Sequence, residues 1–164
     1  MEYGKALRAY PNYVEALSDL ATIFLLYNRP ESALVFLRRA QELDEGNPLI
    51  NLNIAIALTE QAEYGDAMKL LKKVLHDNPR SALANFYIAR IHFRQKKYGE
   101  AREAAQKAVE TDPRLLDAWL MIVNASTEEK KYDQAKDALT HIRQSIANGK
   151  VAAFIDEQLS TFGS

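Results

Sequence analysis

The residue types that most often carry out catalysis are few and scattered in this chain. It has no cysteine, and no metal-ligand spacing connects its three histidines, His76, His92 and His141. Neighbouring carboxylates such as Glu128 and Glu129 point to different faces of a helix, which is typical of a solvated surface rather than of an acid–base pair. Neither a nucleophile elbow nor a phosphate-binding glycine loop is present. The sequence therefore predicts no enzyme activity, no cofactor and no metal site.

The composition limits the classes of partner. The chain has 164 residues, of which 48% are hydrophobic and 26% charged, with a formal net charge of −1. Such a chain lacks the excess of lysine and arginine that offsets nucleic-acid phosphates, and no apolar run reaches the ~18 residues of a membrane span. We therefore expect neither a nucleic acid nor a membrane as partner. The composition assigns no cellular compartment.

Charge is uneven along the chain. Residues 14–47 carry three basic and six acidic side chains, whereas residues 82–115 carry seven basic and four acidic ones. Ordinary surface charge is the interpretation for Lys96, Lys97, Arg102 and Lys107. For Arg90 and Arg94, ordinary surface charge and a role in binding a partner are equal alternatives.

A repeat of 34 residues organises most of the chain. Alanine recurs at Ala33, Ala67, Ala101 and Ala135, and these alanines define repeat position 20. In that frame position 7 is leucine or isoleucine in every copy, and position 27 is alanine, valine or isoleucine. A fixed period of this length is typical of solenoids, in which each unit buries its apolar face only against its neighbours.

Each repeat is predicted to contain two helices. Apolar residues fall at helical spacing in both halves, as at Leu17, Leu20, Ala21 and Phe24. Breaker segments separate the two halves, and proline-containing segments separate one repeat from the next. Small residues at positions 8 and 20 would let the two helices of a pair approach closely.

This pattern resembles the tetratricopeptide repeat family. The period, the alanine columns, the tyrosine at position 17 and the proline at position 32 fall where the family has them, and Trp119 occupies the family's tryptophan position in the fourth copy. The resemblance implies an all-α fold, a right-handed α-solenoid of antiparallel helix pairs. The four repeats that it implies are residues 14–47, 48–81, 82–115 and 116–147.

The two ends extend this frame. Tyr3, Ala6 and Pro11 fit the second half of a preceding repeat helix, so we expect residues 1–13 to be such a half and the chain to be a fragment of a longer repeat protein. At the other end, the segment from Val151 to Leu159 is amphipathic. We expect residues 148–164 to form a helix that caps the last repeat.

In the family, the first helix of each repeat lines a concave groove. The corresponding positions here hold many apolar and aromatic side chains, and aromatic residues with arginine dominate binding energies at interfaces. The expected partner-binding residues are Leu49, Leu52, Asn53, Ile56, Phe86, Tyr87, Arg90, Arg94, Met121 and Asn124. The alternative is that Leu52, Ile56 and Phe86 pack between adjacent first helices.

The resemblance and this groove predict a non-catalytic scaffold or adaptor that binds a peptide or a helix of another protein. Of the five residues with which chaperone-binding relatives hold a terminal carboxylate, only Asn53 is present, and the asparagine ladder of the O-linked glycosyltransferase superhelix is not matched either. Two alternatives remain. One is a self-assembly module that forms a homo-oligomer through the solenoid ends, and the other is the regulatory arm of an enzyme whose catalytic domain lies elsewhere.

Overall fold

The computed structural model describes residues 13–145 and 149–161, and every regular element in those ranges is an α-helix. The chain divides into two compact units, unit 1 (Met1–Pro79) and unit 2 (Arg80–Ser164). The expectation for residues 1–13 falls almost entirely on residues 1–12, which lie outside the described ranges.

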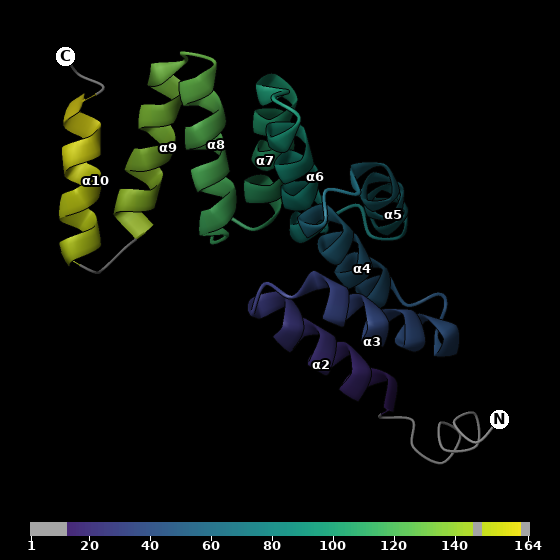
Figure 1. The fold of residues 1–164 in the computed structure, drawn as a ribbon. Helices are drawn as coiled ribbons and strands as arrows, with labels where there is room; N and C mark the ends of the chain where they lie inside the picture. Colours follow the sequence, from purple (N-terminus) through teal and green to yellow (C-terminus); the bar gives the residue numbers. More distant parts are fainter. Residues whose placement is uncertain (1–12, 146–148, 162–164) are drawn as a thin grey trace. The chain divides into compact units, whose positions relative to one another are not determined.

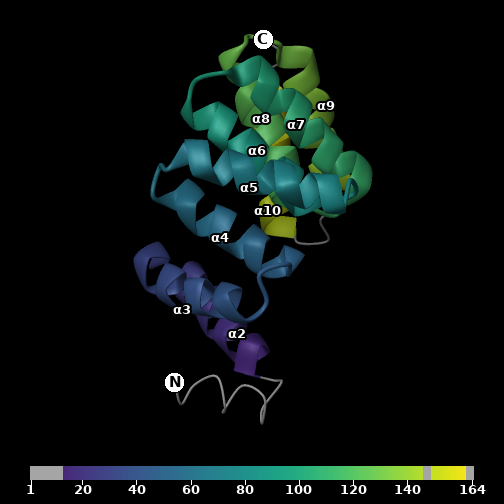
Figure 2. The same cartoon turned by 90° about the vertical axis from the view of Figure 1, so that its right-hand side faces the viewer.

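Unit 1 contains two antiparallel helix pairs. Its helices are α2 (Tyr13–Leu26), α3 (Pro30–Leu43), α4 (Pro48–Glu60) and α5 (Tyr64–Asp77). Helix α3 packs against both α2 and α4, and the two first helices α2 and α4 also contact each other (Figure 2). The alanines at positions 8 and 20 are fully buried, as at Ala21 and Ala33 of the first pair. Small side chains therefore allow the close approach of the two helices, as the sequence predicted.

Unit 2 repeats this arrangement and adds one helix. Its helices are α6 (Ala82–Arg94), α7 (Tyr98–Thr111), α8 (Leu116–Glu128), α9 (Tyr132–Ser145) and α10 (Gly149–Thr161). Each helix packs on the next in the chain, and Figure 1 shows α8, α9 and α10 side by side. In the core of unit 2, Ala105, Ala108 and Val109 of α7 share one apolar cluster with Ala118 and Ile122 of α8.

The turns inside the helix pairs share one backbone geometry. One residue in each turn has a positive φ: Asn28 (53°), Ala62 (62°), Lys96 (60°) and Lys130 (58°). The next residue donates its N–H to the carbonyl oxygen five residues earlier, as from Arg29 to Phe24 (2.8 Å). This bond is part of the Schellman motif, in which glycine usually takes the left-handed position. The predicted breaker segments are these turns, although Gly65 and Gly99 lie inside α5 and α7.

Side chains also fix the connections between helix pairs of the same unit. In unit 1 the Asn47 side-chain oxygen accepts hydrogen bonds from the backbone N–H groups of Leu49 (3.0 Å) and Ile50 (3.3 Å) at the start of α4. In unit 2 the Trp119 indole N–H donates to the carbonyl oxygen of Pro113 (2.9 Å), which ties α8 to the loop before it. These bonds satisfy polar groups that a helix end or a partly buried indole would otherwise leave to water.

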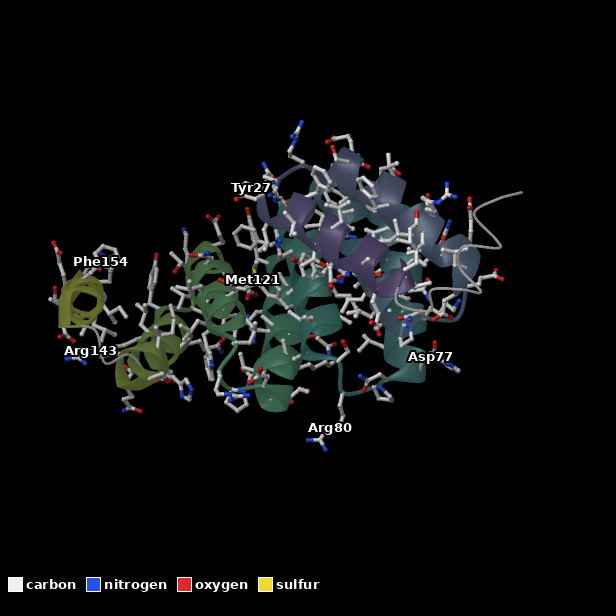
Figure 3. The ribbon with its side chains drawn as sticks, turned by 90° about the horizontal axis from the view of Figure 1, so that it is seen from below. Tyr27, Asp77, Arg80, Met121, Arg143 and Phe154 are labelled. Atoms are coloured by element: carbon white, nitrogen blue, oxygen red, sulfur yellow. The ribbon has the colours of Figure 1, made fainter. Side chains whose placement is uncertain are left out.

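Helix α10 covers the last helix pair of unit 2. Ile155 of α10 shares an apolar cluster with Leu139 and Ile142 of α9. The Arg143 Nε atom also lies 2.9 Å from Asp156 Oδ1, which adds an ion pair between the two helices. In Figure 3, Arg143 and Phe154 lie on opposite sides of α10. Phe154 is exposed and is not among the buried residues of that cluster.

Candidate functional site

The histidines lie in three different surroundings. His76 is exposed near the end of α5, with its Nδ1 atom 3.0 Å from Asp77 Oδ1. The His141 ring stacks on the Trp119 indole, with ring centroids 3.9 Å apart and an interplanar angle of 24°. His92 is partly buried on α6. Over the part of the chain that the structure describes, no three side chains of metal-binding type gather into a potential ion site.

Of the neighbouring carboxylates, Glu128 is exposed, whereas Glu129 is partly buried and pairs with two basic side chains. Glu129 Oε2 lies 2.9 Å from Arg102 Nε, and Glu129 Oε1 lies 2.7 Å from Lys131 Nζ. The hydrogen bond from Lys131, followed by that from Arg102, holds the pKa of Glu129 below its ordinary value. Arg102 and Glu129 therefore also have a structural role that the sequence analysis did not anticipate, because their ion pair joins α7 to the end of α8.

Within unit 1, the predicted binding residues differ in exposure. Leu49 is exposed and Ile56 is partly buried, whereas Leu52 and Asn53 are buried. The Asn53 side-chain nitrogen lies 3.5 Å from Thr22 Oγ1, so it bridges α4 and α2. The burial of Leu52 agrees with the alternative reading, in which this residue is a packing residue.

Within unit 2, an aromatic pair positions an arginine. The Arg90 guanidinium lies 5.1 Å from the centroid of the Tyr87 ring and 5.9 Å from that of Phe86. The two rings meet edge to face at 5.3 Å. Phe86 itself is buried in the apolar cluster of unit 2. Its burial agrees with the alternative in which Phe86 packs between adjacent first helices. Cation–π attraction thus restricts the orientation of Arg90.

The remaining predicted residues of unit 2 reach the surface. Arg94 and Asn124 are exposed, and Tyr87 and Met121 are partly buried. Asn124 lines a pocket of about 380 Å³ that opens on the first-helix face between α8 and α10. Its lining residues are Phe93, Leu120, Val123, Asn124, Thr127, Glu128, Leu139, Phe154 and Gln158.

This pocket combines apolar walls with a few polar groups. Leu120 is 45% exposed and Phe154 is 59% exposed, which leaves large apolar side chains in contact with water. Asn124, Glu128 and Gln158 supply amide and carboxylate groups, and the hydroxyl of Thr127 already donates to the carbonyl oxygen of Val123 (2.8 Å). Concave apolar surfaces with a few polar groups are typical of binding sites.

The list of predicted binding residues omits Phe154 because that residue lies outside the four repeats. The sequence feature that could have identified Phe154 is its position relative to the buried face of α10. Ala152 and Ile155 of α10 are buried, and Phe154 falls off the helical face that these two residues define. A large aromatic residue off the packing stripe of a capping helix is the feature that could have identified it.

A second hollow lies on the opposite, second-helix side of unit 2, between α7 and α9. Its lining includes Arg102, Gln106, Gln134, Asp137 and the stacked pair of Trp119 and His141. Two of these residues already have structural roles, because Arg102 pairs with Glu129 and Trp119 binds the carbonyl of Pro113. The pocket between α8 and α10 is therefore the better candidate for a binding site.

Two comparisons bear on the sequence. Family models of the tetratricopeptide repeat match residues 52–115 and residues 92–155. The comparison with curated proteins gave no match. None of the helices in the described ranges has the length and apolar character needed to cross a membrane.

Solved structures with the same fold come from several proteins. Pseudomonas aeruginosa pilF has 22% identity and a TM-score of 0.77, over 92% of this chain and 69% of that one. MamA has 21% identity and a TM-score of 0.68, over 97% of this chain and 87% of that one. A chain of the APC/C hetero-tetramer Cut9-Hcn1 has 17% identity and a TM-score of 0.77, over 98% of this chain and 32% of that one. The predicted fold class, an all-α solenoid of antiparallel helix pairs, is confirmed.

Proposed function

Because the chain belongs to the tetratricopeptide repeat family, whose members serve as protein-interaction scaffolds, we propose that it binds a segment of another protein on the first-helix face of unit 2. The observation that carries this proposal is the pocket between α8 and α10, with Leu120 and Phe154 exposed at its edge. An adaptor or scaffold of this kind needs no catalytic group of its own.

An apolar side chain of the partner would enter this pocket. Full burial of one leucine-sized side chain stabilises a complex by roughly 1.5–3 kcal/mol, and association costs at least about 4 kcal/mol in lost freedom of motion. One anchor is therefore insufficient, and the partner must also contact neighbouring residues. Asn124, Glu128 and Gln158 supply hydrogen-bonding groups at the same pocket.

The remaining contacts come from the predicted residues of unit 2. Tyr87, Arg90, Arg94 and Met121 lie on α6 and α8, the two first helices that contact each other. The aromatic pair restricts Arg90 before any partner arrives, which lowers the entropy cost of using it. The predicted binding residues of unit 1 stay a separate prediction, which comprises Leu49, Leu52, Asn53 and Ile56. Of these, Leu49 is exposed and Ile56 is partly buried, so these two could contact a partner.

A comparative capture experiment tests the proposal. The full chain is immobilised beside two variants, Leu120→Ser with Phe154→Ser, and Tyr87→Ala with Arg90→Glu. Bound proteins from the native source are then identified by mass spectrometry. We expect both variants to lose a protein that the unchanged chain retains.

The matched control is Val35→Ser on α3, because Val35 is an exposed large apolar residue that belongs to neither pocket nor groove. It must retain the partner, and circular dichroism must show the same helix content for every variant. Equal capture by the unchanged chain and by both site variants would contradict binding on this face.

A further inference from the structure

The pocket between α8 and α10 carries its charge at one end. Figure 1 shows that α8 and α10 run in the same direction, with α9 between them. Leu120 and Phe154, the exposed large apolar residues of the lining, lie toward the starts of the two helices. Glu128 is the last residue of α8, and of the described residues that line the pocket it alone is charged. The pocket is therefore apolar at one end and acidic at the other.

Tyr98 orients the carboxylate of Glu128. The hydroxyl of Tyr98 donates a hydrogen bond to Glu128, and loss of solvation, followed by the charge of Glu128 and this bond, raises the pKa of Tyr98. The Tyr98 ring also meets Phe93, another residue of the pocket lining, edge to face at 5.3 Å. Glu128 is exposed, and within the described ranges no ion pair engages it. Its carboxylate is thus held in place and open to a cation of a partner.

The neighbouring first helix carries the opposite charge at the same level. Arg94 and Glu128 both occupy repeat position 13, as the last residues of α6 and α8, and these two helices contact each other. Arg94 is exposed. In sequence, α6 contains two arginines and no acidic residue, whereas α8 contains Asp117 and Glu128 and no basic residue. The charge on the first-helix face of unit 2 therefore changes sign between α6 and α8.

The length of the pocket limits the spacing of the side chains that fill it. Leu120 and Glu128 are separated by eight residues of α-helix, which span about 12 Å. Side chains on one side of a partner segment lie roughly 6 Å apart, two positions apart in an extended chain or four in a helix. Lysine and arginine have long apolar stems that lie on apolar surface while the charged end stays in water. Such a side chain next to an apolar anchor can therefore reach Glu128.

We propose that the partner segment presents a large apolar residue and a lysine or arginine on the same side, two positions apart if extended or four if helical. The apolar side chain enters the pocket beside Leu120 and Phe154, and the basic side chain pairs with Glu128. Acidic residues of the segment are favoured only toward Arg94. This inference rests on the proposed function and adds the chemistry of the partner to it. Charges at such a rim select the partner more than they raise its affinity.

Selection from a library of random short peptides displayed on phage tests this inference. The baits are the full chain, the double variant Leu120→Ser with Phe154→Ser, and the single variants Glu128→Gln and Glu128→Lys. Sequencing of the retained peptides gives their residue preferences. We expect the unchanged chain to enrich a basic residue two or four positions from a large apolar one. Glu128→Gln should lose the preference for the basic residue, and Glu128→Lys should replace it with a preference for aspartate or glutamate.

A titration gives the size of the effect. The most enriched peptide is labelled, and its binding to each chain is measured by fluorescence anisotropy. Glu128→Gln should weaken binding by up to about fivefold, the range for an exposed ion pair, and the loss should shrink at high salt. Glutamine keeps an oxygen that accepts the Tyr98 hydrogen bond, so this variant keeps its fold. The control is Glu110→Gln, an exposed residue of α7 outside the pocket, and it must bind as the unchanged chain does.

The outcomes separate this inference from the proposed function. Peptides that need Leu120 and Phe154 but show no preference for a basic residue would overturn the inference and leave the proposed function in place. A preference that Glu128→Lys leaves unchanged would do the same. Peptides retained equally by the Leu120→Ser, Phe154→Ser variant, or no enrichment at all, would contradict the proposed function and this inference with it.

Discussion

Unit 1 and unit 2 are built from the same helix pairs, but their outer helices differ in what covers them. In unit 2, α10 buries Leu139 and Ile142 of α9 behind Ile155. In unit 1, by contrast, Leu20 and Ile23 of the first helix α2 are 37% and 48% exposed. The difference shows that the burial of an apolar helix face depends on the helix that packs against it.

The largest expected effect comes from replacing one isoleucine by alanine in each unit, a buried one in α10 and a partly solvated one in α2. Ile155→Ala should lower the free energy of unfolding of unit 2 by about 2–4 kcal/mol, because it opens a cavity against Leu139 and Ile142. Ile23→Ala should change stability by less than about 0.5 kcal/mol, because Ile23 is largely solvated. Urea unfolding followed by the fluorescence of Trp119, the single tryptophan, reports on unit 2, and circular dichroism reports on the whole chain. Equal losses for the two variants would break the comparison between the two ends.

A smaller effect is expected where an ion pair joins α7 to α8. Glu129→Gln should lower the stability of unit 2 by about 1–2 kcal/mol at neutral pH, because it removes charge-assisted hydrogen bonds to Arg102 and Lys131. The exposed Glu110→Gln on α7 is the control, and it should change stability little.

The same variant has a pH signature. The pKa of Glu129 is lowered in the folded chain, so its contribution is present above the pKa of the unfolded chain and is lost as the pH falls through the folded value. The difference between the unchanged chain and Glu129→Gln should therefore shrink in acid. Urea titrations at stepwise lower pH measure it, and a difference independent of pH would show that the ion pair is not its source.

The turns inside the helix pairs should respond alike in both units. Ala62→Gly in unit 1 and Lys130→Gly in unit 2 each relieve a positive φ, and we expect each to raise stability by about 0.5–1 kcal/mol. Thermal unfolding by circular dichroism measures both. A gain in stability in one unit and a loss in the other would mean that the units differ in their turns as well as in their outer helices.

The smallest effect is expected at the ion pair between α9 and α10. Arg143 and Asp156 are both substantially exposed, and exposed pairs contribute about 0.2–1 kcal/mol at most. Asp156→Asn should therefore cost far less than Ile155→Ala in the same urea experiment. A loss as large as that of Ile155→Ala would show that charge, rather than apolar burial, holds the cap.

Much of the fold could be predicted from the sequence because its information is local and periodic. The alanines at positions 8 and 20, such as Ala55 and Ala67, are fully buried as predicted. Helices α4, α6 and α8 begin at Pro48, Ala82 and Leu116, where the 34-residue frame starts its repeats. Proline, capping residues and apolar spacing act within a few residues of each other, so they can be read without knowing what packs on the helix.

The candidate site could be predicted only in part. Leu52 and Leu120 share repeat position 5, yet Leu52 is buried and Leu120 is 45% exposed. The Arg102–Glu129 pair joins residues 27 positions apart, and Phe154 joins the pocket from a helix outside the repeat. The sequence by itself determined which helices form and which small residues lie inside each pair. Only the tertiary structure decided which apolar side chains remain exposed and which charges meet, because burial and ion pairing depend on the neighbouring helices rather than on a residue's own place in the repeat.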